Sequence, residues 1–175
     1  MIKLKDILLE NTAPDIFIPR RMEDRIERMI KSYIRNGSKG DLNLSDMELT
    51  VLPDILKDIT VDGDFSCVGN RLTSLQNAPN SIRGSFVCSF NKLTSLKGAP
   101  KTVDGHFYCS FNKLESLEGA PQSVGYDFKC SSNHLESLKG APQSVGGNFI
   151  CNFNPFIFSK RLVRVVSKVK GKIIV

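Results

Sequence analysis

Phe65-Ser66-Cys67-Val68-Gly69-Asn70-Arg71-Leu72-Thr73-Ser74-Leu75 opens a pattern that returns along the chain without insertion. Written as Phe-x-Cys-x-x-Asn-x-Leu-x-x-Leu, it recurs at 86–96, 107–117 and 128–138, and its Phe, Cys and Asn return once more at 149–154. The five cysteines are evenly spaced, so the period is 21 residues. A fixed period of this length predicts a solenoid in which each repeat forms one coil and contacts only its neighbours.

A second half that contains proline follows each of these units. Ala-Pro steps stand at 78–79, 99–100, 120–121 and 141–142, and a Val or Ile and then a Gly come after each of them. Proline fixes φ and removes a hydrogen-bond donor, and it also disfavours helical geometry in the residue before it. We therefore expect the returning half of each coil to be extended or polyproline-like.

The repeat resembles that of the leucine-rich-repeat family, with Phe and Cys where two of the strand leucines usually stand. Its length and its proline-bearing half are most similar to the short bacterial repeats of secreted effector proteins. The resemblance implies an α/β-type solenoid with a curved parallel β-sheet on its concave side and an extended, non-helical convex side. It also implies recognition of other proteins by the concave sheet, and it implies no chemistry.

Three segments are expected from these patterns. Residues 1–40 form an N-terminal segment with an amphipathic capping helix, and residues 41–157 form the leucine-rich-repeat solenoid. Residues 158–175 form a basic C-terminal cap. The first repeat of the solenoid, at 42–61, departs from the pattern, as terminal repeats commonly do.

Both caps have helix signals. Apolar residues between 20 and 36 recur at spacings of three and four, and Asn36-Gly37 follows as a typical helix end. In the C-terminal cap, Ser159 is a suitable N-cap for a short helix, and the final 172–175 read as a last strand that closes the sheet. We expect each helix to bury one face against the solenoid.

The net charge of +6 is unevenly distributed. Residues 41–157 carry nine Lys/Arg and twelve Asp/Glu, whereas residues 158–175 carry six Lys/Arg and no acid. No apolar run is long enough to span a membrane, and no signal peptide is visible in the first residues. We therefore expect a protein without a membrane span.

The cysteines do not have the spacing of a metal site. Zinc ligands come as close pairs such as C-x-x-C, whereas here each thiol is expected beside its counterpart in the next coil. An odd number of cysteines without a signal peptide fits a reducing compartment. We expect a ladder of small buried side chains, a cytoplasmic location, no metal and no cofactor.

Period-2 alternation predicts which strand positions face outward. Phe65 and Cys67 point inward, so the residues before, between and after them face out, and stacking turns each such position into a column. The first column is Asp64, Ser85, His106, Asp127 and Asn148; the second is Ser66, Val87, Tyr108, Lys129 and Ile150; the third is Val68, Ser89, Ser110, Ser131 and Asn152. We call these three columns the concave face.

Part of the concave face has the composition of a protein-binding site. Apolar and aromatic side chains around a positive charge are suited to anchoring a protein partner. The predicted site is His106, Tyr108, Lys129, Val87, Asp127 and Ile150. The caps and the edges of the solenoid are the alternative locations for a binding site.

Two further positions recur in each repeat. The asparagines at 70, 91, 112, 133 and 154 are expected to turn inward and satisfy backbone groups of the bend and of the neighbouring coil. Phe90, Phe111 and Phe153 come directly before three of them and are expected to cover the edge of the core. An exposed aromatic strip is the alternative for these three residues.

The sequence offers little chemistry. It contains two histidines, His106 and His134, and no Gly-x-Ser-x-Gly, phosphate loop or His-Glu-x-x-His. The cysteines are expected to point into the core, away from His106, so no Cys-His pair is predicted. We expect a non-enzymatic module that binds an unidentified protein partner and has no small-molecule substrate.

Two other functions remain open from the sequence. The N-terminal ten residues resemble the head-targeting peptides of T-even-type phages, which a prohead protease removes; the matching residues are Leu8, Leu9 and Glu10. That resemblance implies a virion or internal head component packaged in a phage particle. Alternatively, the basic C-terminus could bind nucleic acid, although its interleaved apolar residues favour a buried face instead.

Overall fold

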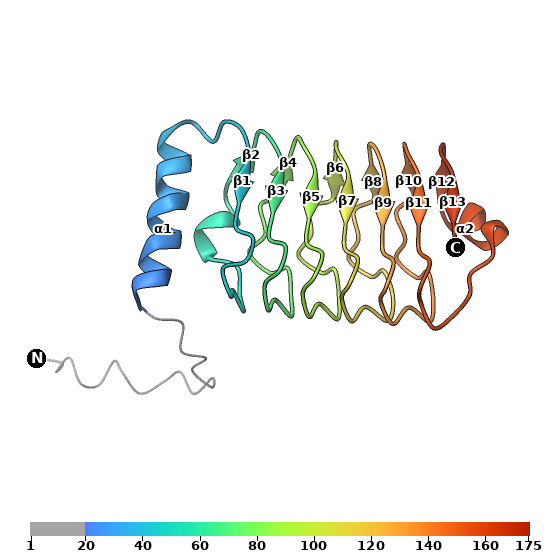
Figure 1. The fold of residues 1–175 in the computed structure, drawn as a ribbon. Helices are drawn as coiled ribbons and strands as arrows, with labels where there is room; N and C mark the ends of the chain where they lie inside the picture. The colour runs from blue at the N-terminus through green and yellow to red at the C-terminus, as the bar shows by residue number, and fades with distance from the viewer. Residues whose placement is uncertain (1–19) are drawn as a thin grey trace, which may run out of the picture.

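The computed structural model describes residues 20–175, which form a stack of coils closed by a helix at each end (Figure 1). Each complete coil contributes two short strands, and the strands form two parallel sheets. The expected solenoid is therefore confirmed. The first sheet, which we call sheet A, contains β1 (Leu42–Asn43), β3 (Phe65–Ser66), β5 (Phe86–Val87), β7 (Phe107–Tyr108), β9 (Phe128–Lys129), β11 (Phe149–Ile150) and β13 (Ile173–Ile174).

Sheet A is the sheet that the repeat predicts. Its register pairs Phe65 with Phe86 and Phe86 with Phe107, so that equivalent residues of successive coils lie side by side. The Phe and Cys side chains point into the solenoid and are fully buried or nearly so. The buried rings form one continuous column, with centroids 5.1–5.6 Å apart.

The second sheet was not predicted from the sequence. Sheet B contains β2 (Thr60–Val61), β4 (Ser81–Ile82), β6 (Thr102–Val103), β8 (Ser123–Val124), β10 (Ser144–Val145) and β12 (Lys168–Val169). Each of its strands has two residues, which is too short for an alternating pattern to be recognised. The returning half is extended, as expected, and its buried Val or Ile packs into the core.

A column of glycines lies between the two sheets in each coil. The backbones of successive coils approach closely here: a Cβ placed on Gly105 would lie 2.5 Å from the carbonyl carbon of Gly84. The amide of Gly105 also donates to the carbonyl of Gly84, at 3.0 Å. Glycine therefore allows the backbone contact at Gly105; in the coil where Tyr126 holds this position, the preceding Gly125 makes the close approach, to the carbonyl of Asp104.

The asparagines form the expected ladder inside the bend after sheet A. The amide nitrogen of Asn112 donates to the carbonyls of Cys88, in the preceding coil, and Cys109, in its own coil, both at 3.1 Å. Its Oδ1 accepts a hydrogen bond from the backbone N–H of Leu93, at 3.0 Å. Asn70, Asn91, Asn133 and Asn154 make equivalent contacts.

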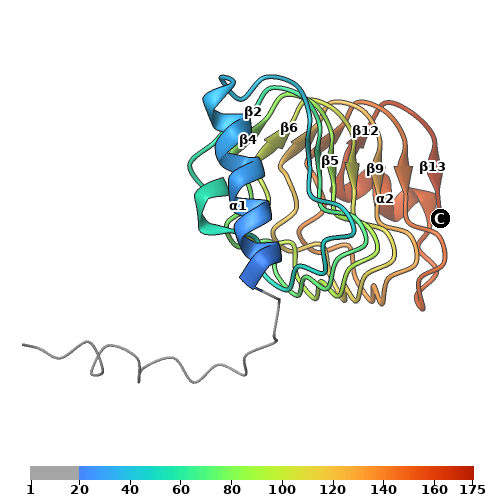
Figure 2. The same cartoon turned by 60° about the vertical axis from the view of Figure 1, so that its left-hand side comes forward.

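Helix α1 (Arg20–Arg35) covers the N-terminal end of the solenoid (Figure 2). Its Ile26 and Ile30 are buried in the same hydrophobic core as the first coil. The convex side of this first coil contains a single 3₁₀ turn, η1 (Asp54–Leu56), with Leu56 buried. The complete coils that follow have no helix on this side, which agrees with the proline-bearing half. The expected capping helix is confirmed.

The C-terminal end is closed by α2 (Lys160–Val166), followed by β12 and β13. The hydroxyl of Ser159 accepts a hydrogen bond from the backbone N–H of Leu162, at 3.1 Å, so the predicted N-cap is confirmed. β13 pairs with β11 and extends sheet A, as expected for a closing strand. None of the helices in residues 20–175 has the length and apolar character that crossing a membrane requires.

Candidate protein-binding surface

The second column of the concave face lies where the sequence places it. The register of sheet A pairs Val87 with Tyr108, Tyr108 with Lys129 and Lys129 with Ile150, so these four side chains form one row across the sheet. All four are partly exposed. The row therefore offers alternating apolar, aromatic and charged groups to a partner.

Lys129 and Tyr108 of this row form a cluster with two further rings, His106 of the first column and Tyr126. The ammonium group of Lys129 lies 4.3 Å from the centroid of the Tyr108 ring, which is a cation–π contact. The imidazole of His106 lies 5.2 Å from Tyr108 and 5.2 Å from Tyr126, both measured between ring centroids. These contacts hold the four side chains in a defined arrangement before any partner arrives, which lowers the entropy cost of binding.

Tyr126 was not among the predicted site residues. It is 60% exposed and stands in the glycine column, where the neighbouring coils have Gly105 and Gly147. The sequence did contain a signal for Tyr126, because every other member of its column is a glycine. These glycines are Gly63, Gly84, Gly105, Gly147 and Gly171. A ring that replaces glycine at a site of close backbone contact is a candidate for function.

The first column has a structural role that was not predicted. The Nδ1 atom of His106 accepts a hydrogen bond from the backbone N–H of Asp127, at 3.1 Å. Asp127 Oδ1 in turn accepts from the backbone N–H of Asn148, at 2.7 Å, and Asp64 and Ser85 make the same kind of contact. Two predicted site residues therefore also connect neighbouring coils: His106 through its Nδ1 atom and Asp127 through its Oδ1 atom.

The prediction for the third column was wrong in part. Ser89 and Ser110 are buried, although they were expected to face out as freely as Tyr108. The backbone begins to turn into the bend at this position, because the next residue, Phe90 or Phe111, has a positive φ. The exposed part of the concave face therefore consists mainly of the first two columns.

The prediction for the phenylalanines of the bend was also wrong. Phe90, Phe111 and Phe153 are 55%, 50% and 79% exposed, so they do not cover the core. Their φ angles are +58°, +58° and +57°, in the left-handed region, which costs a residue other than glycine about 1–3 kcal/mol. The turned backbone sends each side chain outward, and the rings of Phe90 and Phe111 stack at 4.4 Å.

The cysteines form the buried ladder that was expected. All five are free thiols inside the solenoid. Burial raises the pKa of Cys67 to about 12, and burial likewise raises the pKa of Cys88, Cys109 and Cys130. A protonated, inaccessible thiol is a poor nucleophile and a poor metal ligand. Within residues 20–175, no group of three or more His, Cys, Asp or Glu side chains is placed to hold a metal ion.

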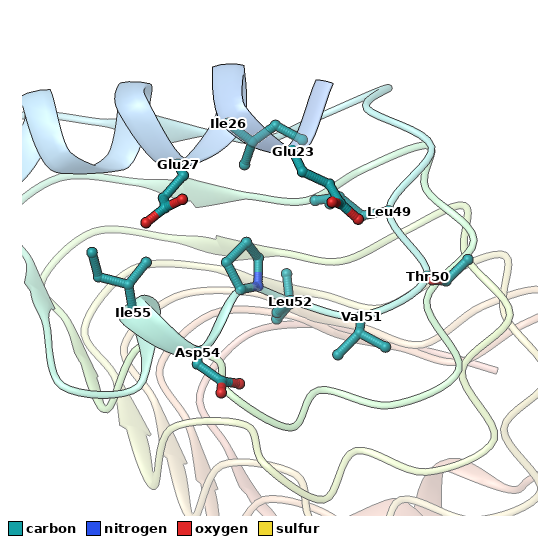
Figure 3. A pocket seen from close by; sticks show the side chains of 10 residues that line it. Glu23, Ile26, Glu27, Leu49, Thr50, Val51, Leu52, Asp54 and Ile55 are labelled. Carbon is teal, nitrogen blue, oxygen red and sulfur yellow. The ribbon is translucent and has the colours of Figure 1, made fainter. Parts of the chain in front are cut away.

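A pocket of about 610 Å³ lies between α1 and the first coil (Figure 3). Its walls are mostly apolar and include Ile26, Leu49 and Val51. Carboxylates of Glu23, Glu27 and Asp54 also line it, and among the side chains that the structure describes, those of residues 22–175, no basic one does. The N-terminal cap is therefore a second place where a partner with apolar and basic groups could bind.

The C-terminal cap buries less than expected. Val163 is buried, but Leu162, Val165 and Val166 are exposed together with the basic side chains of α2. Binding of nucleic acid by this cap stays a prediction. The residues that match the phage processing sequence, Leu8, Leu9 and Glu10, lie outside the described residues, so the expectation of a virion component stays a prediction as well.

Comparisons with known proteins add a likeness of fold. No protein-family model and no curated protein matches the chain. Among solved structures, the leucine-rich-repeat domain of a Shigella effector is similar, with 15% sequence identity and a TM-score of 0.47 over 90% of this chain and 92% of that one. The 21-residue coil, the parallel sheet A and the asparagine ladder are by themselves those of a leucine-rich-repeat solenoid.

Proposed function

We propose that this protein is a non-enzymatic interaction module that binds a protein partner on the concave face. The observation that supports the proposal most strongly is the cluster of His106, Tyr108, Tyr126 and Lys129. Tyrosine is among the residues that contribute most to binding at protein interfaces, and here neighbouring contacts hold both tyrosines in place. Val87 and Ile150 extend the same surface with apolar groups.

The contrast between core and surface supports the same function. The inward positions of the coils keep Phe, Cys, Asn and Leu, whereas the outward positions of sheet A change from coil to coil. A scaffold that holds a varied surface on a uniform core is typical of repeat proteins that recognise a macromolecule. Burial raises the pKa of Cys67, Cys88, Cys109 and Cys130, which disfavours these thiols as nucleophiles and agrees with a function without catalysis.

Photo-cross-linking from defined positions tests the proposal. A photoreactive phenylalanine analogue replaces Ile150 on the concave face, and in a matched control it replaces Lys101, which is exposed on the returning half. The proposal expects a cross-linked protein from position 150 and none from position 101. Cross-linking from position 101 alone would place the partner on the convex side and contradict the proposal.

A further inference from the structure

The exposed phenylalanines form a column that we call the aromatic edge: Phe90, Phe111 and Phe153, with Gly69 and Ser132 at the equivalent positions of the other complete coils. All five residues have φ between +53° and +68°. The coils with Gly69 and Ser132 close their bends with the same backbone geometry. A bulky ring is therefore not needed to form the bend, and it occupies a conformation that disfavours it.

The aromatic edge is an ordered stack. The rings of Phe90 and Phe111 are parallel to within 9°, with centroids 4.4 Å apart. The backbone amides of Phe90, Phe111 and Ser132 each donate to the carbonyl of the residue before the equivalent position in the next coil, at 3.1 Å. The coils are thus in register along the whole edge, and the rings project from equivalent points.

Ser132 leaves one position of this stack without a ring. Phe111 and Phe153 are two coils apart, and because coils repeat at about 5 Å their points of attachment are separated by about 10 Å. A flat group placed above Ser132 would lie about 5 Å from a ring on each side, which is within the range of aromatic stacking. The edge therefore has room for one planar group between two exposed rings.

Charges beside the edge indicate which planar group fits. Two residues after four of the five members of the edge stands an exposed basic or imidazole side chain, at Arg71, Lys92, Lys113 and His134, whereas Pro155 follows Phe153. Arg71 is paired with Glu48, at 3.5 Å, so Lys92, Lys113 and His134 flank the stack. A carboxylate next to the inserted ring would pair with the ammonium group of Lys92 or Lys113.

The same surroundings disfavour a nucleic acid. Glu115 and Glu136 are exposed two residues beyond Lys113 and His134, so a phosphate backbone that ran along the basic groups would pass beside two carboxylates. Residues 41–157 also carry more acidic than basic side chains. Non-specific binding of nucleic acid depends on an excess of positive charge, which this edge lacks.

We propose that the aromatic edge binds a peptide segment of a protein partner, with an aromatic side chain of the peptide inserted above Ser132 between Phe111 and Phe153. An acidic residue next to that side chain pairs with Lys113 or Lys92. This site is separate from the cluster on the concave face and does not depend on it.

The chain offers a sharp test variant, Ser132→Phe. Phenylalanine already occurs at this left-handed position in three coils, so the variant is expected to fold with an uninterrupted stack of rings and no room for a guest. Ser132→Ala is the matched control, because it keeps the gap. Circular dichroism and thermal unfolding of both variants establish that they are folded.

The experiment selects binders from a library of random short peptides on the immobilised full chain. Selected peptides that contain tryptophan are then synthesised and titrated with the protein. The chain has no tryptophan, so the fluorescence of the peptide reports its own surroundings. We expect the selected peptides to contain an aromatic residue next to Asp or Glu. Compared with the wild type, they should bind Ser132→Phe at least about tenfold more weakly and Ser132→Ala equally well. Tyr108→Ala/Lys129→Glu should bind them like the wild type.

Any one of the following results would overturn the inference. The first is the absence of any enriched peptide, and the second is enrichment of peptides without an aromatic residue. The third is equal binding to the wild type and Ser132→Phe, or loss of binding in the concave-face variant, which would place the peptide elsewhere. The fourth is tighter binding of oligothymidylate than of any peptide, lost in Ser132→Phe, which would make the guest a nucleobase.

Discussion

The side-chain amide of Asn91 joins two coils: its nitrogen donates to the carbonyl of Cys67, one coil earlier, at 2.9 Å, and its oxygen accepts from the backbone N–H of Leu72, at 3.0 Å. One buried side chain thus satisfies two backbone groups that the bend leaves without a partner. The ladder of such residues allows a bend of irregular backbone to sit inside the solenoid. It also fixes the register on which both proposed binding surfaces depend.

Asn112→Ala is expected to lower the free energy of unfolding by about 3 kcal/mol, because it leaves buried backbone groups of Leu93, Cys88 and Cys109 without their partner. Urea denaturation followed by circular dichroism measures the change. Lys113→Ala, at the exposed neighbouring position, is the control and should change stability by less than about 0.5 kcal/mol. Equal stability of the two variants would show that the ladder contributes little.

Gly105→Ala is expected to destabilise the protein strongly. The new Cβ would lie 2.5 Å from the carbonyl carbon of Gly84, so the two coils would have to move apart and lose backbone hydrogen bonds. Asp104→Ala, at the exposed position before it, should be tolerated. The midpoint of thermal unfolding distinguishes the two, and a Gly105→Ala variant as stable as Asp104→Ala would contradict the close contact.

Stability is expected to fall in alkaline solution because of the cysteine ladder. The pKa of Cys67 is about 12 in the folded chain, whereas an unfolded thiol has a pKa of about 8.5. Between these values the unfolded chain releases a proton that the folded chain keeps, so the free energy of unfolding decreases as pH rises. Urea midpoints measured between pH 7 and 10 should decrease, and the decrease should be smaller in Cys109→Ala.

The same burial should protect the thiols from reagents. We expect a thiol-reactive dye to label Cys67, Cys88, Cys109 and Cys130 slowly in the native protein and rapidly in the urea-unfolded protein, because the thiolate is the reactive form and burial disfavours it. Rapid labelling of native protein at neutral pH would mean that the coils open easily. The reducing, cytoplasmic location stays a prediction.

Much of the fold could be predicted because the repeat constrains it. Phe65, Cys67 and Asn70 occupy fixed positions in a unit of constant length, so their counterparts must stack, and the burial of each follows from its type. Sheet B was missed because its strands, such as β4, have two residues and give no periodic signal. The backbone contact at Gly84 and Gly105 depends on the distance between coils, which no single repeat reveals.

The candidate site was harder to predict for a different reason. The alternation of side chains along a strand places Tyr108 and Lys129 correctly. It assumes, however, that the strand continues to the third column, whereas the chain leaves the sheet one residue after Tyr108 and Lys129. The positive φ at Phe90 reverses the direction of its side chain, and a phenylalanine gives no signal for such a conformation. Tyr126 was overlooked because its position lies outside the strand that the repeat highlights.

The proposed function requires that the concave face binds a protein. Capture of a partner from a lysate of the cells that make this protein, with wild type, Tyr108→Ala/Lys129→Glu and the convex control Lys101→Glu as bait, tests it most directly. We predict that one protein is captured by the wild type and by Lys101→Glu and is lost with the concave-face variant, while all three baits unfold at the same temperature. Undiminished capture by the folded concave-face variant would contradict the claim.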